Sequence, residues 1–236
     1  MRLLLRCFIG VIQNLFIINM FRKYEKTFRV SGPKGKLSLT EAEIKNLFSG
    51  KVVIEEKMDG ANVGIIRHKK GFHLQKRGSL VGPSEHKQFQ YFHAWANQKM
   101  YANIMNIPMN YIFYGELLYA VHTIYYDKLP DYVLIFDVWD GEKYLNWVER
   151  NDICNELGFH RVPLIAYDYF YPKSVEMTIP GPSAYGDVAE GIVIKKYTKS
   201  GEYYRGKIVK PEFVKEMEES DHWMHKEVKT NKLFKA

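Results

Sequence analysis

The feature that most constrains the fold is a series of short apolar runs that are rich in β-branched and aromatic residues. Tight turns separate several of them, such as Asp59-Gly60 after the first run and Lys69-Lys70-Gly71 after the second. Runs of this composition are typical of strands, and tight turns join strands that pair antiparallel. The predicted strands lie at residues 52–54, 62–66, 72–75, 111–118, 132–139 and 191–197, with a last one through 209.

Three helices are predicted beside these strands. Thr40 and Glu43 have the spacing of a capping box, and so do Asn146 and Glu149. Between them, aromatic residues recur at helical spacing from residue 85 to about 105, which predicts an amphipathic helix with an aromatic stripe in the core. Strand runs mixed with a few helices predict an α+β protein with mainly antiparallel sheets and flanking helices.

Composition places the chain among ordinary globular proteins. Its 236 residues are 46% hydrophobic and 26% charged, which excludes a disordered or collagen-like chain. At roughly 150 residues per domain, the length predicts one sizeable domain, or one domain with an appendage. The chain has 34 Lys+Arg against 27 Asp+Glu, a formal charge of +7, which is compatible with a polyanionic partner but does not establish one.

Cysteine and histidine usage is sparse. Cys7 and Cys154 lie far apart in different contexts, and they form neither a disulfide framework nor a C-x-x-C metal motif. This pattern favours a reduced, cytoplasmic protein. His222 and His225 could share a helix face, but without further ligands they are expected to be surface histidines rather than a metal site.

Residues 1–19 form an apolar leader with two early arginines. A secretory signal begins in this way, but Gln13 and Asn14 interrupt the apolar run and no small-residue cleavage site follows. The run is also broken too early for a membrane span, which needs roughly 20 apolar residues. We therefore expect Met20 to be the start, with the leader an upstream extension, and no membrane association unless residues 1–19 are a real signal.

The common nucleotide and hydrolase motifs are absent. Residues 32–36 read G-P-K-G-K but lack the G-x-x-x-x-G-K-[ST] spacing of a phosphate loop. Neither G-x-G-x-x-G nor G-x-S-x-G occurs. The sequence therefore does not indicate a Walker ATPase, a Rossmann enzyme or an α/β-hydrolase.

A different set of motifs does occur, in order along the chain. It begins with E-K-M-D-G-A-N at 56–62, where a lone K-x-D-G is a weak signal because any strand–turn–strand can use Asp-Gly. The later elements are K-R-G at 76–78, Y-G-E at 114–116, F-D-V at 136–138 and E-G-I-V-I-K at 190–195, with Lys207 and Lys210 downstream. This ordered set resembles the covalent nucleotidyltransferases, namely DNA ligases, RNA ligases and mRNA capping enzymes. It is most similar to the RNA ligase 2 type, which seals nicks in duplex RNA.

The resemblance covers roughly residues 20–213. It implies a nucleotidyltransferase domain of the ATP-grasp-like ligase adenylation type, which a charged helical tail at 214–236 is expected to follow. It implies ATP as co-substrate, Mg²⁺ or Mn²⁺ as cofactor, and an RNA partner, either a nicked duplex or broken ends, bound by a monomer. The implied reaction joins 5′-phosphate and 3′-hydroxyl ends through a lysyl-AMP intermediate and an adenylated 5′ end. A small DNA ligase, a GTP-using capping-type nucleotidyltransferase and a non-catalytic nucleic-acid-binding relative remain alternatives.

Lys57 is the nucleophile that the resemblance implies. A lysine with a pKa near 10.4 is neutral in only about one molecule in 2,500 at pH 7, yet it must lose its proton to attack an α-phosphorus. We expect Lys207, Lys210, a divalent metal and desolvation to lower the pKa of Lys57.

The resemblance assigns nucleotide contacts to five further residues. Asn62 is expected near the ribose or α-phosphate, the Glu56 backbone at the adenine, and Glu116 at a ribose hydroxyl. Arg77 is expected to bind the sugar or the 5′-phosphate of the strand being joined. Phe136 is expected to stack on adenine, with packing in the core as a serious alternative because its neighbours are equally apolar.

The remaining residues are assigned to metal and phosphate. Glu190 is expected to bind the catalytic divalent cation, which takes carboxylate and phosphate oxygens. Lys195, Lys207 and Lys210 are expected to neutralise the polyphosphate and the transition state. The final family motif has two lysines separated by one residue, whereas two residues separate Lys207 from Lys210 here. Strand alternation directs these two lysines to opposite faces unless a bulge intervenes, so which one faces the α-phosphate stays open.

Overall fold

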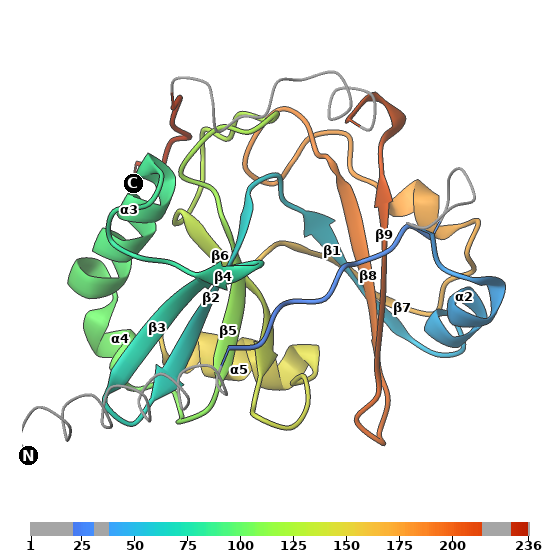
Figure 1. Cartoon of the computed structure of the whole chain (residues 1–236). Helices are drawn as coiled ribbons and strands as arrows, with labels where there is room; N and C mark the ends of the chain where they lie inside the picture. The colour runs from blue at the N-terminus through green and yellow to red at the C-terminus, as the bar shows by residue number, and fades with distance from the viewer. Residues whose placement is uncertain (1–20, 31–37, 214–227, 236) are drawn as a thin grey trace, which may run out of the picture.

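Two antiparallel sheets form the centre of the protein (Figure 1). The computed structural model describes residues 21–30, 38–213 and 228–235. In strand order, the first sheet contains β7 (Leu164–Asp168), β1 (Val52–Lys57), β8 (Gly191–Tyr197) and β9 (Tyr203–Val209). The second sheet contains β4 (Ser79–Leu80), β3 (Gly71–Lys76), β2 (Ala61–His68), β5 (Ile112–Leu117) and β6 (Val133–Trp139). Every strand pair in both sheets is antiparallel, which confirms the predicted α+β class.

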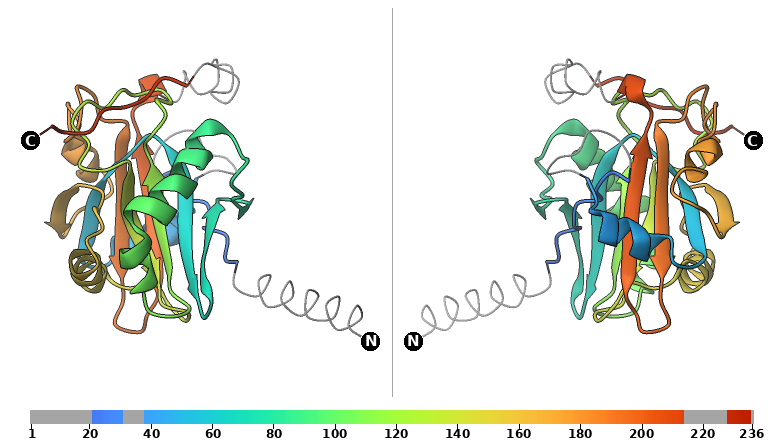
Figure 2. Two further views of the ribbon diagram at one scale, coloured as in Figure 1. Left: turned by 90° about the vertical axis from the view of Figure 1, so that its left-hand side faces the viewer. Right: turned by 90° about the vertical axis from the view of Figure 1, so that its right-hand side faces the viewer.

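Helices cover the outer sides of the two sheets (Figure 2). Behind the second sheet, α3 (Lys87–Ala94), the π-helix η1 (Trp95–Lys99) and α4 (Tyr101–Met105) bury their apolar side chains against β2, β5 and β6, together with part of α5 (Trp147–Glu156). Behind the first sheet, α2 (Glu41–Leu47) and the 3₁₀-helix η2 (Val175–Thr178) pack on β1, β8 and β9. This arrangement leaves the inner faces of the two sheets turned toward each other.

The helix starts follow the sequence signals. Thr40 accepts a hydrogen bond from the backbone of Glu43, whose carboxylate bonds back to Thr40, and Asn146 and Glu149 do the same at the start of α5. The helix predicted from 85 to 105 is correct in place but is divided into three pieces. At its centre the Met100 N–H donates to the Trp95 carbonyl, five residues back, which is the spacing of a π-helix.

Strand register decides which side chains line the inner face of the first sheet. Residues directly opposite in a pair point to the same side, and side chains alternate along each strand. Lys57 lies opposite Gly191, Glu55 opposite Val193, and Val193 opposite Lys207. Lys57, Glu55 and Lys207 therefore share the face that is turned toward the second sheet.

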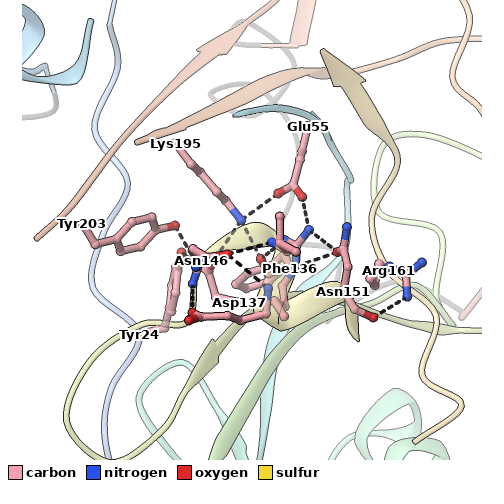
Figure 3. Close-up of polar contacts among 12 residues, drawn as sticks. Tyr24, Glu55, Phe136, Asp137, Asn146, Asn151, Arg161, Lys195 and Tyr203 are labelled. Carbon is pink, nitrogen blue, oxygen red and sulfur yellow. Dashed lines mark hydrogen bonds and ion pairs between the residues drawn. The ribbon is translucent and has the colours of Figure 1, made fainter. Parts of the chain in front are cut away.

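A buried ionic network joins the two sheets at their centre (Figure 3). Glu55 on β1 pairs with Arg150 of α5 at 2.5 Å and with Lys195 of β8 at 2.7 Å. Lys195 also pairs with Asp137 on β6 at 3.0 Å. The cations on both sides keep the pKa of Glu55 below its ordinary value, although burial alone would raise it. The network therefore fixes the spacing between the sheets through charges that are compensated.

Replacing Arg150 by methionine is expected to lower the free energy of unfolding by about 3 kcal/mol, because it leaves the Glu55 carboxylate with one cation in a site that excludes water. Urea unfolding monitored by Trp fluorescence measures this difference. Arg161→Met is the matched control, since among the described residues the Arg161 guanidinium donates to Asn151 and Asn155 at the rim, and it should cost less than about 1 kcal/mol. Equal midpoints for both variants would contradict a structural role for the network.

The C-terminal strap, defined as residues 228–235, is extended rather than helical. Asn231 is buried, and its amide group donates to the carbonyls of Leu118 and Ala120 while its oxygen accepts from the Tyr126 N–H. Leu233 pairs with Leu129. The helical tail expected at 214–236 is therefore wrong for the strap, because alternate residues turn inward to bond a loop. Residues 214–227 lie outside the described part of the chain.

Several further expectations also fall outside the described residues. They concern the leader at 1–19, the start at Met20, and Cys7, His222 and His225. Within the ranges that the structure does describe, none of the helices combines the length and apolarity that crossing a membrane requires.

Candidate active site

The predicted nucleophile and the predicted metal ligand meet at the edge of the inner face. Lys57 is the last residue of β1, and Glu190 directly precedes β8. The Nζ of Lys57 lies 2.5 Å from Oε2 of Glu190, although 133 residues separate them in sequence. The Lys57 side chain is 23% exposed and that of Glu190 only 3%, so the ammonium is the accessible member of the pair.

The charge state of Lys57 differs from the expectation. Burial alone would lower its pKa, but Glu190, Glu116 and Asp59 together hold the pKa of Lys57 above its ordinary value. The predicted lowering is therefore wrong for the ligand-free chain, because three carboxylates outweigh burial and the nearby cations. A positive charge placed on Glu190 is what would reverse the shift.

Glu116 approaches Lys57 from the second sheet. Its Oε1 accepts a hydrogen bond from the Gly60 N–H at 3.2 Å. Burial raises the pKa of Glu116 to about 7, Lys57 opposes this, and Glu190 adds to it. A side chain at Gly60 would place its Cβ 2.5 Å from the Leu117 carbonyl, so only glycine lets the turn approach β5 this closely.

Replacing Glu116 by glutamine is expected to stabilise the ligand-free protein at pH 8. The folded pKa of Glu116 is about 7, above the unfolded value of about 4.3, so the folded state binds the proton more tightly and wild-type stability falls as the pH rises between these values. Glutamine removes this loss, and we expect a gain of about 2 kcal/mol at pH 8 and little change at pH 4. Urea midpoints at the two pH values measure it, with the exposed Glu142→Gln as control. A variant that is equally destabilised at both pH values would contradict the assignment.

Asp59 shapes the turn, as the sequence suggested. Its Oδ2 accepts hydrogen bonds from the backbone N–H groups of Thr123 and Ile124 at 2.7 and 2.8 Å. The Asp59 N–H donates to the hydroxyl of Tyr126. The K-x-D-G turn is thereby fastened to the loop between β5 and β6.

Lys207 and Lys210, the two lysines of the final motif, lie on different sides of β9. Lys207 is half-buried on the inner face, where burial and then the charge of Lys57 lower its pKa to about 8. Lys210 follows the strand, its N–H donates to the Glu190 carbonyl, and its Nζ lies 3.1 Å from the Gly181 carbonyl. Lys207 is therefore the lysine that shares a face with Lys57.

Asn62 and Arg77 border the same space from the second sheet. Asn62 lies opposite Glu116 in the pairing of β2 with β5, and its buried Oδ1 has no hydrogen-bond partner among the described residues. Arg77 is exposed in the turn after β3, and its charge acts on both Glu116 and Lys207.

Glu56 has a different environment from its neighbour Lys57. Its backbone is the part that the family resemblance assigns to adenine, and its backbone N–H donates to the Pro163 carbonyl at 2.9 Å. Its buried carboxylate accepts the Ala184 N–H through Oε2, while Oε1 has no hydrogen-bond partner in the part of the chain that is described. The N–H and one carboxylate oxygen of Glu56 are therefore both bonded within the protein.

Phe136 and Lys195 lie on the inner side of the network. Phe136 occupies a β-bulge, since Tyr114 pairs with Asp137 and the next residue pairs with Ile135. Its half-buried ring contacts Tyr24 at 5.0 Å between centroids and lies beneath the Lys195 ammonium at 5.6 Å. Glu55 and Asp137 both form ion pairs with Lys195, so the charge of Lys195 is compensated within the network.

Glu190 has the properties of a protein ligand for a hard divalent cation whose other ligands are mainly phosphate oxygens. The described residues contain no group of three His, Cys, Asp or Glu side chains that could hold a metal ion unaided. Mg²⁺ characteristically takes one or two carboxylates and completes its shell with phosphate oxygens and water. A single buried carboxylate beside the predicted nucleophile fits that mode of binding.

Comparison with known proteins agrees with this geometry. The sequence pattern of the family described as RNA ligase matches residues 50–210. The chain belongs to the RNA ligase family. No curated protein matches it in sequence.

Solved structures of Naegleria gruberi RNA ligase share the fold. The structure with PPi aligns with a TM-score of 0.66 and 18% identity, over 85% of this chain and 59% of that chain. A lysine-to-alanine mutant with ATP and Mn aligns with a TM-score of 0.65 and 18% identity, over 84% and 58%. This family member therefore spans less than two thirds of the Naegleria enzyme.

Proposed function

We propose that the protein is an ATP-dependent RNA ligase that joins 5′-phosphate and 3′-hydroxyl ends through a lysyl-AMP intermediate. The observation that carries the proposal is the inner face on which Lys57 contacts Glu190 at 2.5 Å and shares its side of the sheet with Lys207. Membership of the RNA ligase family supports it. The substrate we propose is a nicked duplex or broken RNA ends, bound by a monomer in the cytoplasm.

The proposed chemistry has three steps. Lys57 Nζ gives up a proton to solvent, its lone pair attacks the α-phosphorus of ATP, an N–P bond forms, and the bond to pyrophosphate breaks. A 5′-phosphate oxygen of the RNA then attacks the same phosphorus, and the N–P bond breaks, which returns Lys57 and leaves an adenylated 5′ end. The 3′-hydroxyl oxygen finally attacks the phosphorus of the original 5′-phosphate and loses its proton, the phosphodiester bond forms, and the bond to AMP breaks.

Three side chains and the Glu56 backbone are proposed to hold the nucleotide. Asn62 offers its buried Oδ1, which lacks a hydrogen-bond partner among the described residues, toward the ribose or α-phosphate. Glu116 accepts from a ribose hydroxyl, Phe136 offers its ring to adenine, and the Glu56 backbone contacts the adenine. Since an unpaired buried oxygen is costly, the Oδ1 of Asn62 supports a site that a polar ligand completes.

The phosphates and the metal are assigned to the charged residues. Glu190 holds Mg²⁺ or Mn²⁺, which when bound supplies positive charge to the phosphate oxygens. Lys207 neutralises the developing charge directly, and exposed Arg77 binds the 5′-phosphate or sugar of the incoming strand. The Lys195 ammonium donates a hydrogen bond to the Phe136 carbonyl, and the Lys210 ammonium donates one to the Gly181 carbonyl. We propose that these bonds position the two segments rather than contact phosphate.

Incubation with each α-labelled nucleoside triphosphate and Mg²⁺, followed by denaturing separation, tests the proposal. We expect label from ATP to remain on the protein and to be transferred to 5′-phosphorylated RNA. Label from GTP instead would indicate a capping-type enzyme, and sealing of DNA nicks in preference to RNA would indicate a DNA ligase. Nucleic-acid binding without an adduct from any nucleotide would indicate a non-catalytic relative and overturn the proposal.

A further inference from the structure

Exposed lysines and aromatic rings gather on the strap and on the loop that it covers. We call this set the strap surface. It consists of Lys128 and Tyr125 from the loop, and Lys229, Lys232, Phe234 and Lys235 from the strap. The Lys232 ammonium lies 6.0 Å from the centre of the Tyr125 ring. Among described residues 119–132 and 228–235, Asp127 is the one exposed acidic side chain.

The strap surface is held in place rather than loosely attached. Besides the side-chain bonds of Asn231, the Leu129 N–H donates to the Lys232 carbonyl, and the N–H groups of Lys232 and Phe234 donate to the carbonyls of Tyr126 and Leu129. Asn231 and Leu233 turn inward, Lys232 and Phe234 alternate with them and turn outward, and Lys229 and Lys235 near the two ends of the strap are exposed. A ladder of this kind presents the lysines without the entropy cost of ordering a free tail.

The strap surface also lies beside the proposed nucleophile. Tyr125 directly follows Ile124, whose N–H bonds the Asp59 carboxylate, and it directly precedes Tyr126, whose hydroxyl accepts the Asp59 N–H. In Figure 1 the strap (red) and the loop (yellow-green) lie at the same end of the molecule as the turn between β1 and β2. The strap surface therefore lies at the end of the molecule at which β1 ends with Lys57.

We propose that the strap surface binds the RNA strand next to the end being joined, with its lysines on phosphates and its exposed rings against bases. Positive charge with one opposing carboxylate suits a polyanion, and aromatic rings interleaved with cations are the pattern of single-strand recognition. The proposal rests on the function proposed above for the nucleophile, since it takes RNA to be the substrate.

The test is a triple variant, Lys229→Ala with Lys232→Ala and Lys235→Ala, and its readout is the binding of a fluorescent, 5′-phosphorylated single-stranded RNA at several salt concentrations. Each lost phosphate contact lowers the salt slope by about 0.7, so three contacts lower it by about 2, and binding weakens about a hundredfold at 0.1 M salt. Labelling by ATP, which needs no RNA, should match that of the wild type. The matched control removes the same charge from exposed Lys143, Lys173 and Lys199, which belong to the segments between β6 and α5, before η2, and between β8 and β9.

The outcomes separate the two proposals. Loss of binding in the triple variant alone, with normal labelling, supports the strap surface as an RNA site. An unchanged salt slope in the triple variant overturns it and assigns the surface to another partner, and an equal loss in the control variant overturns it as a general charge effect. If the wild type forms no adduct with ATP, the proposed ligase function fails, while the salt slopes still decide whether the strap surface binds RNA.

Discussion

Lys57→Ala is expected to abolish covalent labelling by ATP, with a loss of at least about 10⁴-fold, because it removes the amine that forms the proposed N–P bond. Lys57→Arg should be equally inactive, since a guanidinium stays protonated and cannot attack. Denaturing separation after incubation with labelled ATP measures both variants. The third step does not use the lysine as nucleophile, so both variants should retain sealing of an RNA whose 5′ end is already adenylated.

Folding controls make this result interpretable. Lys57→Ala removes the partner of the buried Glu190 carboxylate, so the thermal unfolding of the alanine variant must be compared with that of Lys57→Arg, which keeps a cation there. If both variants fold and neither is labelled, the lysine acts chemically. Full labelling of Lys57→Ala would mean that another residue is the nucleophile.

The local parts of the fold followed directly from sequence signals. Capping boxes at Thr40 and Asn146 marked two helix starts correctly, because the hydrogen bonds that make them span only three residues. Ordered motifs also identified Lys57 and Glu190 as candidates before any geometry was available, and the structure brings them into contact. Their assigned roles remain proposals that the experiments above address.

Other features depend on distant residues and gave no usable pattern. Glu55 and Arg150 lie 95 positions apart, and nothing in the sequence around either residue indicates that the two form an ion pair. The raised pKa of Lys57 depends on carboxylates from three separate segments, and the sequence alone does not show that these segments meet around Lys57. The strap was expected to be helical because its bonding to the loop cannot be read from residues 228–235 alone.

Strand alternation predicts that Lys207 and Lys210, the two lysines of the final motif, differ in their effect on the reaction. Lys207→Met is expected to slow adduct formation by about 10²–10³-fold, since it removes a fixed positive charge aimed at the space beside Lys57. Lys210→Met is the matched control and should slow it less than about fivefold, because the Lys210 ammonium contacts the Gly181 carbonyl and not the inner face. Single-turnover rates over a range of ATP concentrations measure both, and the Lys207 effect should fall on the rate at saturating ATP.

The comparison also tests the register of β9. In the structure Lys207 lies opposite Val193, on the side of Glu55 and Lys57, and an exchange of roles between the two lysines would require β9 to shift by one residue. Such a shift would bring Gly206 out of its contact with Val30 and Leu39, where a Cβ would meet Val30 at 2.4 Å. A larger loss in Lys210→Met than in Lys207→Met would therefore contradict both the assignment and this strand pairing. The opposite order would link the proposed phosphate contact to the packing that holds β9 in register.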